Sequence, residues 1–498
     1  MKYLPTIGIE CHVQLATKTK LFSEVDNDAR GKEPNSCVSP VDYALPGMLP
    51  RLNGEAIKLA ILAGRAMNCD INKSSRFDRK HYFYPDSPKG YQITQFYHPI
   101  IGAGYVELPS GTKIRIEHAH LEGDAGKLTH FDTYSLVDLN RVDTPLIEIV
   151  SMPDIHSAKD AHDYCKELWR LMIFAGVSYG DLYNGNMRFD VNVSLAPKDS
   201  KELGTRAEVK NLNSFRSVER AVEYEIKRQS KLLDAGEKVV QETRGWSDAT
   251  GETTGQRSKE EAKDYRYMPE PDLPPINLSN EFIEEESKKL PLMPKDYREI
   301  FGSVISGDTL EVLLDYPTLM QKLAELAGVL PEEFNSGHAQ GRSAKLTVPS
   351  QTSPVTPAIK LVSNLFASVL LAEEKSAEYL NDMPSAKDLK ELAEMNAGKE
   401  LSSTATKEVF LRLFDPQMKG RGAKTIAKEL GLIQENDLGA LEAIVDTVLA
   451  KPETQKAQED FRNGEEKVIG FLVGQVMKES KGKANPSAVQ DILRKKLG

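Results

Sequence analysis

Carboxylate and imidazole side chains share one face of a short segment near the start of the chain. In IGIECHVQL, residues 7–15, apolar and polar residues alternate, which predicts a β-strand with Glu10 and His12 on its polar face. Such a face is either solvated or the floor of a site. The same alternation recurs in MRFDVNVSL (187–195) with Arg188, Asp190 and Asn192, in TRAEVK (205–210) with Glu208 and Lys210, and in IRIEHAHLEGDAGK (114–127), whose even positions run Ile114, Ile116, His118, His120, Glu122 and Asp124.

The residue types on these polar faces favour a site over a solvated surface. For any one strand a solvated face is the commoner explanation, because antiparallel sheets often have one wet face. A solvated face would be rich in long Lys and Glu side chains with Thr. These rows instead carry Glu, His, Asp, Asn and Arg, which ligate cations or bind phosphates.

Glu148 is an isolated carboxylate in an apolar segment. It has two apolar residues on each side in LIEIV, residues 146–150. A carboxylate in such a run is costly to bury unless a metal or a positive charge accompanies it. The alternative is a single polar position that points outward from an otherwise apolar strand.

Taken together, these side chains predict a divalent-cation site. The candidate ligands are Glu10, His12, Glu122 and Glu148, with Asp124 nearby. Oxygen ligands with one imidazole suit Mg²⁺ or Mn²⁺ better than structural zinc. A hard cation beside basic residues also suits the phosphates of a nucleotide.

Cations and aromatic residues alternate in FDRKHYFYPDSPKGYQITQF, residues 77–96. Arg79, Lys80 and Lys89 lie among its tyrosines, a pattern that can hold phosphates or stack bases. A solvated turn with packed tyrosines is an equal alternative. The proline-rich YRYMPEPDLPP, residues 265–275, predicts an extended strap across a site or the exit from a domain.

Several common catalytic motifs are missing from the sequence. There is no GxxxxGK[ST] phosphate loop, no GxSxG nucleophile elbow and no GxGxxG after a strand. An ATP site would therefore have to lie on a sheet face and use a metal.

The composition and the pattern along the chain predict two or three domains. At 498 residues the chain is too long for one ordinary core, and its net charge of −10 argues against a wholly basic nucleic-acid binder. The four cysteines form no CxxC pair, and the sequence has no signal peptide or membrane span, so we expect a soluble protein of the reducing cytoplasm. Capped helices are expected from Ser157 to Gly176 and from Ser214 to Gly236. The expected domains are 1–290 with mixed strands and helices, 291–404 with helices and a loop near 334–358, and 405–498 with a basic end.

Eight motifs in the chain resemble one family, the B subunit of the bacterial aspartyl/glutamyl-tRNA amidotransferase. They are IGIECHVQL, FDRKHYFYPDSPKGYQITQF, HLEGDAGK, YSLVDLNRVDTPLIEIVS, AEVKNLNSF, QETRGW, DYRYMPEPD and FLVGQVMKESKGKANP, between residues 7 and 486. The resemblance implies an α+β fold: an antiparallel-sheet cradle of glutamine-synthetase-like type, an all-α helical domain, and an α-helical YqeY-like tail that contacts tRNA. It also implies ATP and Mg²⁺ (or Mn²⁺) as cofactors.

The resemblance further implies an activity and partners. The B subunit would phosphorylate the side-chain carboxylate of mischarged Asp-tRNA(Asn) or Glu-tRNA(Gln). Ammonia from a glutaminase, the amidase partner, would then displace phosphate, and a small third protein would complete the heterotrimer. By this resemblance the metal ligands are His12, Glu122, Asp124 and Glu148, the catalytic residues are Glu10, His12, Asp190, Glu208 and Lys210, and the nucleotide-binding residues are Arg79, Lys80, Lys89, Arg188 and Asn192.

This chain departs from the family pattern at four places. Gly123 replaces the second acid of the acidic stretch, Met152 replaces a usual Glu, and Phe189 replaces a usual Cys. Some members carry paired cysteines where this chain has residues 39–42, and one cysteine cannot hold zinc, so we expect no structural zinc.

Two rival functions fit the sequence less well. One is a tRNA-binding scaffold without catalysis, which the changes at Gly123 and Met152 favour. The other is a stand-alone ATP-dependent amide ligase that uses free ammonia. The first predicts no tRNA-dependent ATP hydrolysis, and the second predicts that activity survives removal of the C-terminal region.

Overall fold

The computed structural model of this chain describes all residues except 1, 201, 259–264, 330–354, 435–437 and 481–483. The chain divides into two compact units, the first extending to Pro294 and the second beginning at Lys295. The domain boundaries expected near 290 and 404 stay predictions. Most of the loop expected near 334–358 lies outside the described residues, but its last residues are helical because α8 (Thr356–Ser368) begins there with Pro357 in its first turn.

The first unit is built on one large, mainly antiparallel sheet. Its strand order in the described residues is β13-β12-β11-β10-β1-β9-β6-β4-β3-β14, with β5 paired to β6, and the β11–β12 pair is parallel. The strands are β1 (Tyr3–Gln14), β3 (Asp78–His81), β4 (Tyr91–Thr94), β5 (Gly104–Glu107), β6 (Lys113–Gly123), β9 (Pro145–Ser151), β10 (Met187–Pro197), β11 (Ala207–Leu212), β12 (Glu242–Ser247), β13 (Glu252–Ser258) and β14 (Met268–Pro269). Two small ribbons accompany it: β2 (Ser74–Ser75) with β15 (Ile276–Asn277), and β7 (Lys127–His130) with β8 (Ser135–Asp138).

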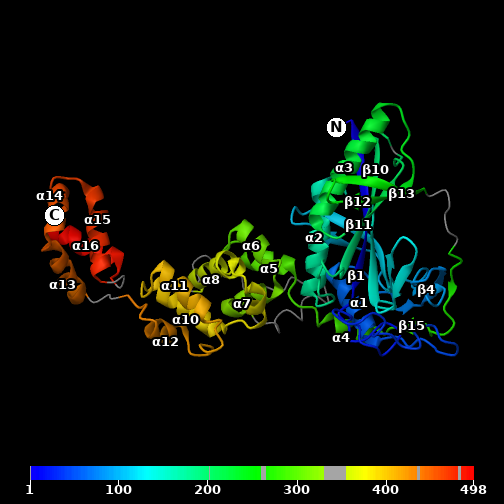
Figure 1. Ribbon diagram of the computed structural model, residues 1–498, viewed down its shortest axis with the longest axis horizontal. Helices are drawn as coiled ribbons and strands as arrows, with labels where there is room; N and C mark the ends of the chain where they lie inside the picture. The colour runs from blue at the N-terminus through cyan, green and yellow to red at the C-terminus, as the bar shows by residue number, and fades with distance from the viewer. Residues whose placement is uncertain (1, 201, 259–264, 330–354, 435–437, 481–483) are drawn as a thin grey trace. The chain divides into compact units, whose positions relative to one another are not determined.

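Helices cover the apolar face of this sheet. From Pro5 onward the odd residues of β1 are buried and its even residues are partly exposed, as the alternation predicted. Helices α1 (Gly54–Ala66), α2 (Ala158–Phe174) and α3 (Phe215–Asp234) supply the covering layer, and α3 packs on β10 and β11 (Figure 1). The helices α2 and α3 confirm the predicted caps, with Ser157 and Ser214 accepting backbone N–H groups at their starts.

A β-bulge in β6 changes which residues face the polar side. The pairing with β9 steps from Ile116 to His118 while the partner advances by one residue, so one extra residue is inserted in β6. Before the bulge Ile114 and Ile116 are buried in the core, and after it Ala119 takes that position. The alternation across 114–124 therefore does not keep one face, and the bulge turns the histidines and Glu122 to the polar side.

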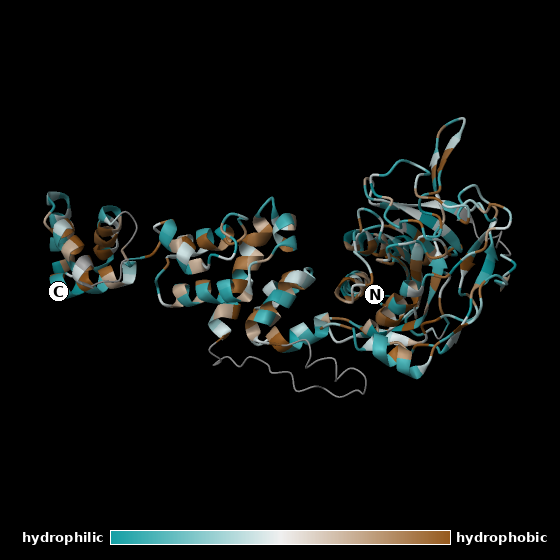
Figure 2. Ribbon diagram, turned by 90° about the horizontal axis from the view of Figure 1, so that it is seen from below, coloured by the Kyte–Doolittle hydropathy of each residue, from teal (hydrophilic) through white to brown (hydrophobic). Residues whose placement is uncertain are grey.

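The second unit consists of helices. They are α5 (Pro294–Phe301), α6 (Gly307–Leu313), α7 (Pro317–Ala327), α8, α9 (Ser376–Asn381), α10 (Ala386–Ala397), α11 (Ser403–Arg412), α12 (Ala423–Glu429), α13 (Leu438–Leu449), α14 (Pro452–Arg462), α15 (Ile469–Glu479) and α16 (Pro486–Leu497), with short 3₁₀ turns at Leu370–Ala372 and Glu466–Val468; the helix α4 (Asn280–Ser287) precedes them in the first unit. Hydrophobic and hydrophilic residues alternate along these helices (Figure 2), as expected of helices with one buried face.

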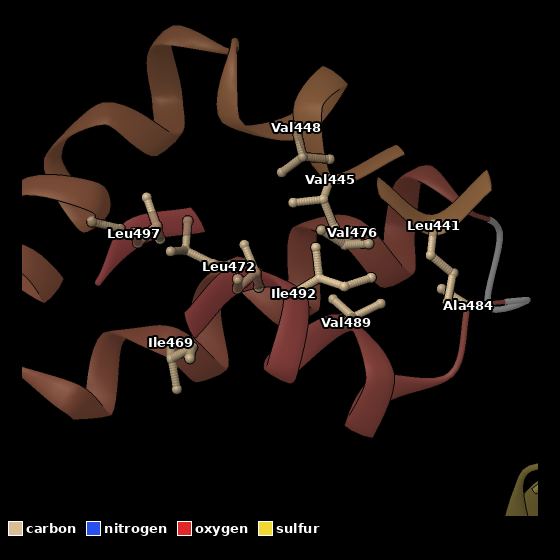
Figure 3. Packing of buried hydrophobic residues seen from close by; sticks show 12 residues of the cluster. Leu441, Val445, Val448, Ile469, Leu472, Val476, Ala484, Val489, Ile492 and Leu497 are labelled. Atoms are coloured by element: carbon tan, nitrogen blue, oxygen red, sulfur yellow. The ribbon is translucent and has the colours of Figure 1, made fainter. Parts of the chain in front are cut away.

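The last four helices enclose a core of their own. Val445 of α13, Leu472 and Val476 of α15 and Val489 of α16 are fully buried and point toward one another (Figure 3). The C-terminal segment thus has the packed interior that a folded tail requires. Among the described residues, no helix is both long enough and apolar enough to cross a membrane.

Candidate metal and phosphate site

Strand register assembles the polar residues into one row across the sheet. Strand β1 lies between β10 and β9, and this register sets Glu10 opposite Asp190 and His12 opposite Glu148. On the next strand, β6, His120 lies opposite Glu148. Residues that are more than 170 positions apart in the chain therefore lie on adjacent strands of one face.

Three side chains of this row form a compact set of ligand atoms, called here the imidazole group: His12, Glu122 and Glu148. The His12 Nε2 lies 3.6 Å from Glu122 Oε1 and 3.5 Å from Glu148 Oε2, and the three ligand atoms are all within 4.8 Å of one another. Two ligand atoms bound to one ion at about 2.1 Å each can lie up to about 4.2 Å apart. The two separations from His12 therefore fit a shared divalent cation.

The charges of the imidazole group are strongly coupled. Burial alone would lower the pKa of His12, but the contact with Glu148 and the charge of Glu122 raise that pKa to about 9. Burial would likewise raise the pKa of Glu148, but His12 and His120 hold it well below its usual range. Without a metal, protonated His12 supplies the positive charge that the two carboxylates need.

Next to it lies a second set, called here the acidic group: Glu10, Asp190 and Glu208, whose ligand atoms also lie within 4.8 Å of one another. The Lys210 Nζ bridges two of them, 2.7 Å from Asp190 Oδ2 and 3.0 Å from Glu208 Oε1. The Asn192 amide donates to Glu10 Oε1 at 3.2 Å. Burial and the neighbouring carboxylates raise the pKa of Glu10, as expected where acids crowd together.

Asp124 does not join the imidazole group. Its carboxylate lies 3.1 Å from Arg141 Nε and 3.3 Å from Arg188 Nη2. Asp124 thus holds these two arginines at the end of the row. The positive charge of Arg188 is therefore already paired with the carboxylate of Asp124.

Two cations of the segment 77–96 are held by ion pairs. Arg79 donates two 2.8 Å hydrogen bonds to Glu270 and one of 3.0 Å to Asp272. Lys89 forms an ion pair with Asp143, and both are nearly buried. Arg79 and Lys89 therefore hold the strap and the turn around Asp143 in place, and their predicted binding of a nucleotide stays a prediction.

Two lysines of that segment, Lys80 and Lys89, line a cavity of about 130 Å³ whose wall also includes Gln92, Asp124 and Tyr265. After burial and the two histidines, the charge of Lys80 also helps to hold down the pKa of Glu148. A phosphate bound beside the two acid groups would meet this lysine.

Comparison with known proteins agrees with the motifs. A family model described as the GatB/GatE catalytic domain matches residues 5–284, and one described as the GatB domain matches residues 351–497. The chain belongs to the GatB family. Proteins named as the B subunit of aspartyl/glutamyl-tRNA(Asn/Gln) amidotransferase are similar to it from end to end: those of Caldicellulosiruptor saccharolyticus (41% identical over 508 residues, 100% of this chain and 99% of that protein), Persephonella marina (41% over 502 residues, 100% of both) and Thermotoga maritima (40% over 510 residues, 100% of this chain and 99% of that protein).

The departures from the GatB pattern leave the imidazole group intact. A Cβ added at Gly123 would meet Asp143 Oδ1 at 2.7 Å and the ring of Phe22 at 3.4 Å, so a side chain there would point into that packed corner. Met152 follows the end of β9, and its backbone N–H donates to the carbonyl of Arg115. Phe189 is buried in the core.

His120 is a residue of this GatB site to which the sequence assigned no role. Its Nε2 lies 3.6 Å from Glu148 Oε2 and 3.9 Å from Glu122 Oε2. Within the described residues its Nδ1 is buried and has no hydrogen-bond partner. The signal in the sequence is its position two residues before Glu122, which puts both on the same face of a strand.

Proposed function

We propose that the chain is the B subunit of a glutamine-dependent tRNA amidotransferase. It phosphorylates the side-chain carboxylate of Asp-tRNA(Asn), of Glu-tRNA(Gln) or of both, using ATP. Ammonia from an amidase partner then forms the amide, and a small third protein completes the heterotrimer in the cytoplasm. The names of the relatives that match the whole chain support this assignment.

The observation that carries the proposal is that the imidazole group and the acidic group lie side by side on one sheet face, with β1 contributing a residue to each. Both the substrate carboxylate and the phosphates of ATP are anions, and the row presents Glu10, Glu122, Glu148, Asp190 and Glu208 to them. Anions can approach so many carboxylates only with cations between them. The residues thus fit Mg²⁺ or Mn²⁺, which the imidazole group would hold, with the acidic group as the second candidate.

The bound cation would neutralise charge on the transferring phosphoryl group. Lys210, fixed between Asp190 and Glu208, adds a positioned donor at the other end of the row. Lys80 adds a charge in the wall of the cavity. The protein residues thereby orient the two anions for transfer, since phosphoryl transfer depends mainly on positioning and charge stabilisation.

We further propose that residues 1–290 form a glutamine-synthetase-like cradle, 291–404 a helical domain, and 405–498 a YqeY-like tail that contacts tRNA. The basic end of the tail carries less free charge than its sequence suggests, because Arg494 pairs with Glu466 and Lys496 with Asp446. Lys481 and Lys483 lie outside the described residues. Any tRNA contact by the tail should weaken as salt increases.

Reconstitution with the amidase and the small third protein tests the proposal. Each mischarged tRNA is supplied with ATP, glutamine and Mg²⁺, and both amidated tRNA and tRNA-dependent ATP hydrolysis are measured. Glu148→Gln should abolish both, because it takes one carboxylate from the imidazole group. The control Glu117→Gln neutralises an exposed acid on the neighbouring strand β6 and should leave the rates unchanged. Full metal-dependent turnover by Glu148→Gln would refute the site.

A further inference from the structure

Aromatic side chains, some exposed and some half-buried, gather beside the polar row. This set is called here the aromatic platform and consists of Phe83, Tyr84, Phe96, Tyr97, Tyr265 and Tyr267, from the β3–β4 loop, the residues after β4 and the strap before β14. Phe83 is 71% exposed, Tyr97 56% and Phe96 49%. Large aromatic residues gathered at this exposure mark a binding surface more often than a chance patch.

The rings of the platform are already ordered. Phe96 and Tyr267 stack with centroids 4.0 Å apart at 12°, and Tyr97 meets the Phe96 ring edge-on at 4.9 Å. The backbone N–H groups of Phe96 and Tyr97 both donate to Asp78 Oδ2 at 3.1 Å, and Asp78 is fully buried. A planar ligand would therefore add to an existing stack without the cost of ordering these side chains.

Cations flank the rings. The Lys80 Nζ lies 5.0 Å from the centre of the Tyr265 ring, and the Arg266 guanidinium lies 5.7 Å from that of Phe83. Aromatic faces for bases with adjacent cations for the backbone are the combination that single-stranded nucleic acids require.

The platform begins next to the imidazole group. Thr94, the last residue of β4, lies opposite Glu122 in the register, and its hydroxyl is 3.4 Å from Glu122 Oε2. Phe96 is two residues further, about 6 to 7 Å along an extended chain. The charges of Glu148 and Glu122 also contribute, after burial, to a raised pKa of Tyr267, as expected for a phenol near those acids.

We propose that the aromatic platform stacks the terminal base at the acceptor end of the aminoacylated RNA. This inference rests on the proposed function. The amino acid is esterified to the ribose of that last nucleotide, so the base and the reacting carboxylate must bind within one nucleotide of each other. A stacked base on the platform sets the esterified side chain over the imidazole group.

The openness of the platform favours a chain end over the adenine of ATP. Sites for free small molecules are concave and enclose most of the ligand. Phe83, Phe96 and Tyr97 are instead exposed to solvent, which leaves room for the nucleotides that precede the terminal base. Adenine of ATP and a partner protein are the other occupants that the experiment must separate.

Steady-state kinetics of the reconstituted heterotrimer separate these occupants. Tyr97→Ala and Phe96→Ala should each raise KM for mischarged tRNA by about 5- to 150-fold, the effect of losing one stacked base, with KM for ATP unchanged. Tyr97→Phe should retain wild-type values because it keeps the ring. The control Phe131→Ala removes a similarly exposed ring, which stacks on Tyr134 near the β7–β8 turn, and should change neither constant.

Binding of RNA without chemistry keeps the inference testable apart from the proposed function. Fluorescence anisotropy compares unacylated tRNA with and without its terminal nucleotide, on wild-type heterotrimer and on Tyr97→Ala. Removing the nucleotide and removing the ring should weaken binding by similar factors, and the two losses should not add. Since this readout needs no turnover, a heterotrimer that fails to amidate would sink the proposed function alone.

Three results would overturn the inference. A rise in KM for ATP in place of KM for tRNA would assign the platform to adenine. Loss of heterotrimer assembly in Tyr97→Ala would assign it to a partner protein. Additive losses in the binding experiment would show that the ring and the terminal nucleotide do not touch.

Discussion

Substitution of Gly123 tests how this chain accommodates its departure from the GatB pattern. A Cβ at this position would lie 2.7 Å from Asp143 Oδ1 and 3.3 Å from Asp143 Cα. Asp143 cannot easily retreat, because it is buried, is paired with Lys89 and has a left-handed backbone with φ 59°. A side chain at position 123 and the side chain at position 143 would thus occupy the same space. In this chain Asp143 fills that space and position 123 is a glycine.

The magnitudes follow from this geometry. Gly123→Ala should destabilise the first unit by about 1–3 kcal/mol, the usual cost of overpacking. Asp143→Gly relieves about 1–2 kcal/mol of left-handed strain but breaks a buried ion pair worth about 3–5 kcal/mol, a net loss of about 1–4 kcal/mol. The double change Gly123→Glu with Asp143→Gly returns an acid to the freed space and should restore stability to within about 1 kcal/mol of wild type, a coupling in the range known for touching residues.

Tryptophan fluorescence during urea unfolding measures these differences in the unit concerned. The two tryptophans of the chain, Trp169 and Trp246, both lie in the first unit, so the signal reports its unfolding and not that of the helical unit. The control Gly54→Ala adds a methyl group where nothing lies within 4 Å and should be neutral or slightly stabilising. A silent Gly123→Ala, or a double variant no more stable than Asp143→Gly alone, would refute the competition for space.

Three further predictions concern the imidazole group and the acidic group. His120→Asn should weaken Mn²⁺ binding, measured by electron paramagnetic resonance, about 10- to 100-fold through loss of its support for a ligand, whereas His118→Asn should not; equal effects would count against the assignment. The pKa of His12 is raised to about 9, so Mn²⁺ affinity should increase as pH rises from 6.5 to 9, with release of a proton. The stability that this shift gives the metal-free chain should be complete below pH ~6.5 and lost as pH passes about 9. Calorimetry of metal binding and thermal melts should show both trends in the wild type and neither in His12→Gln. Lys210→Met should lower kcat about 100-fold or more but cost about 1 kcal/mol or less of stability, since the lysine is partly exposed; a large loss in urea unfolding would instead make it a structural residue.

The local order of the first unit could be predicted from short-range pattern. Alternation in residues 7–15 gave a strand with Glu10 and His12 on one face, and the structure confirms that face. Serine caps and C-terminal glycines gave the starts and ends of α2 and α3. These features depend on neighbours within a few residues, so the sequence carries them directly.

The grouping of the site residues required the tertiary structure. The bulge between Ile116 and His118 reverses the faces of β6, and nothing in the local alternation marks it. Asp124 and Lys89 resemble a metal ligand and a phosphate-binding cation in the sequence, yet partners distant along the chain engage both. An ionisable side chain acts through the charges within a few ångströms of it, and strand pairing decides which charges those are.

The sequence by itself determined the family, the strands that carry the acids, and the chemistry that such side chains favour. The tertiary structure decided that His12 belongs with Glu122 and Glu148 while Glu10 belongs with Asp190 and Glu208. The physical reason is the register on the two sides of β1. Glu10 and His12 are successive residues on one face of β1, but their partners come from different neighbouring strands. One strand face therefore contributes to both the acidic group and the imidazole group.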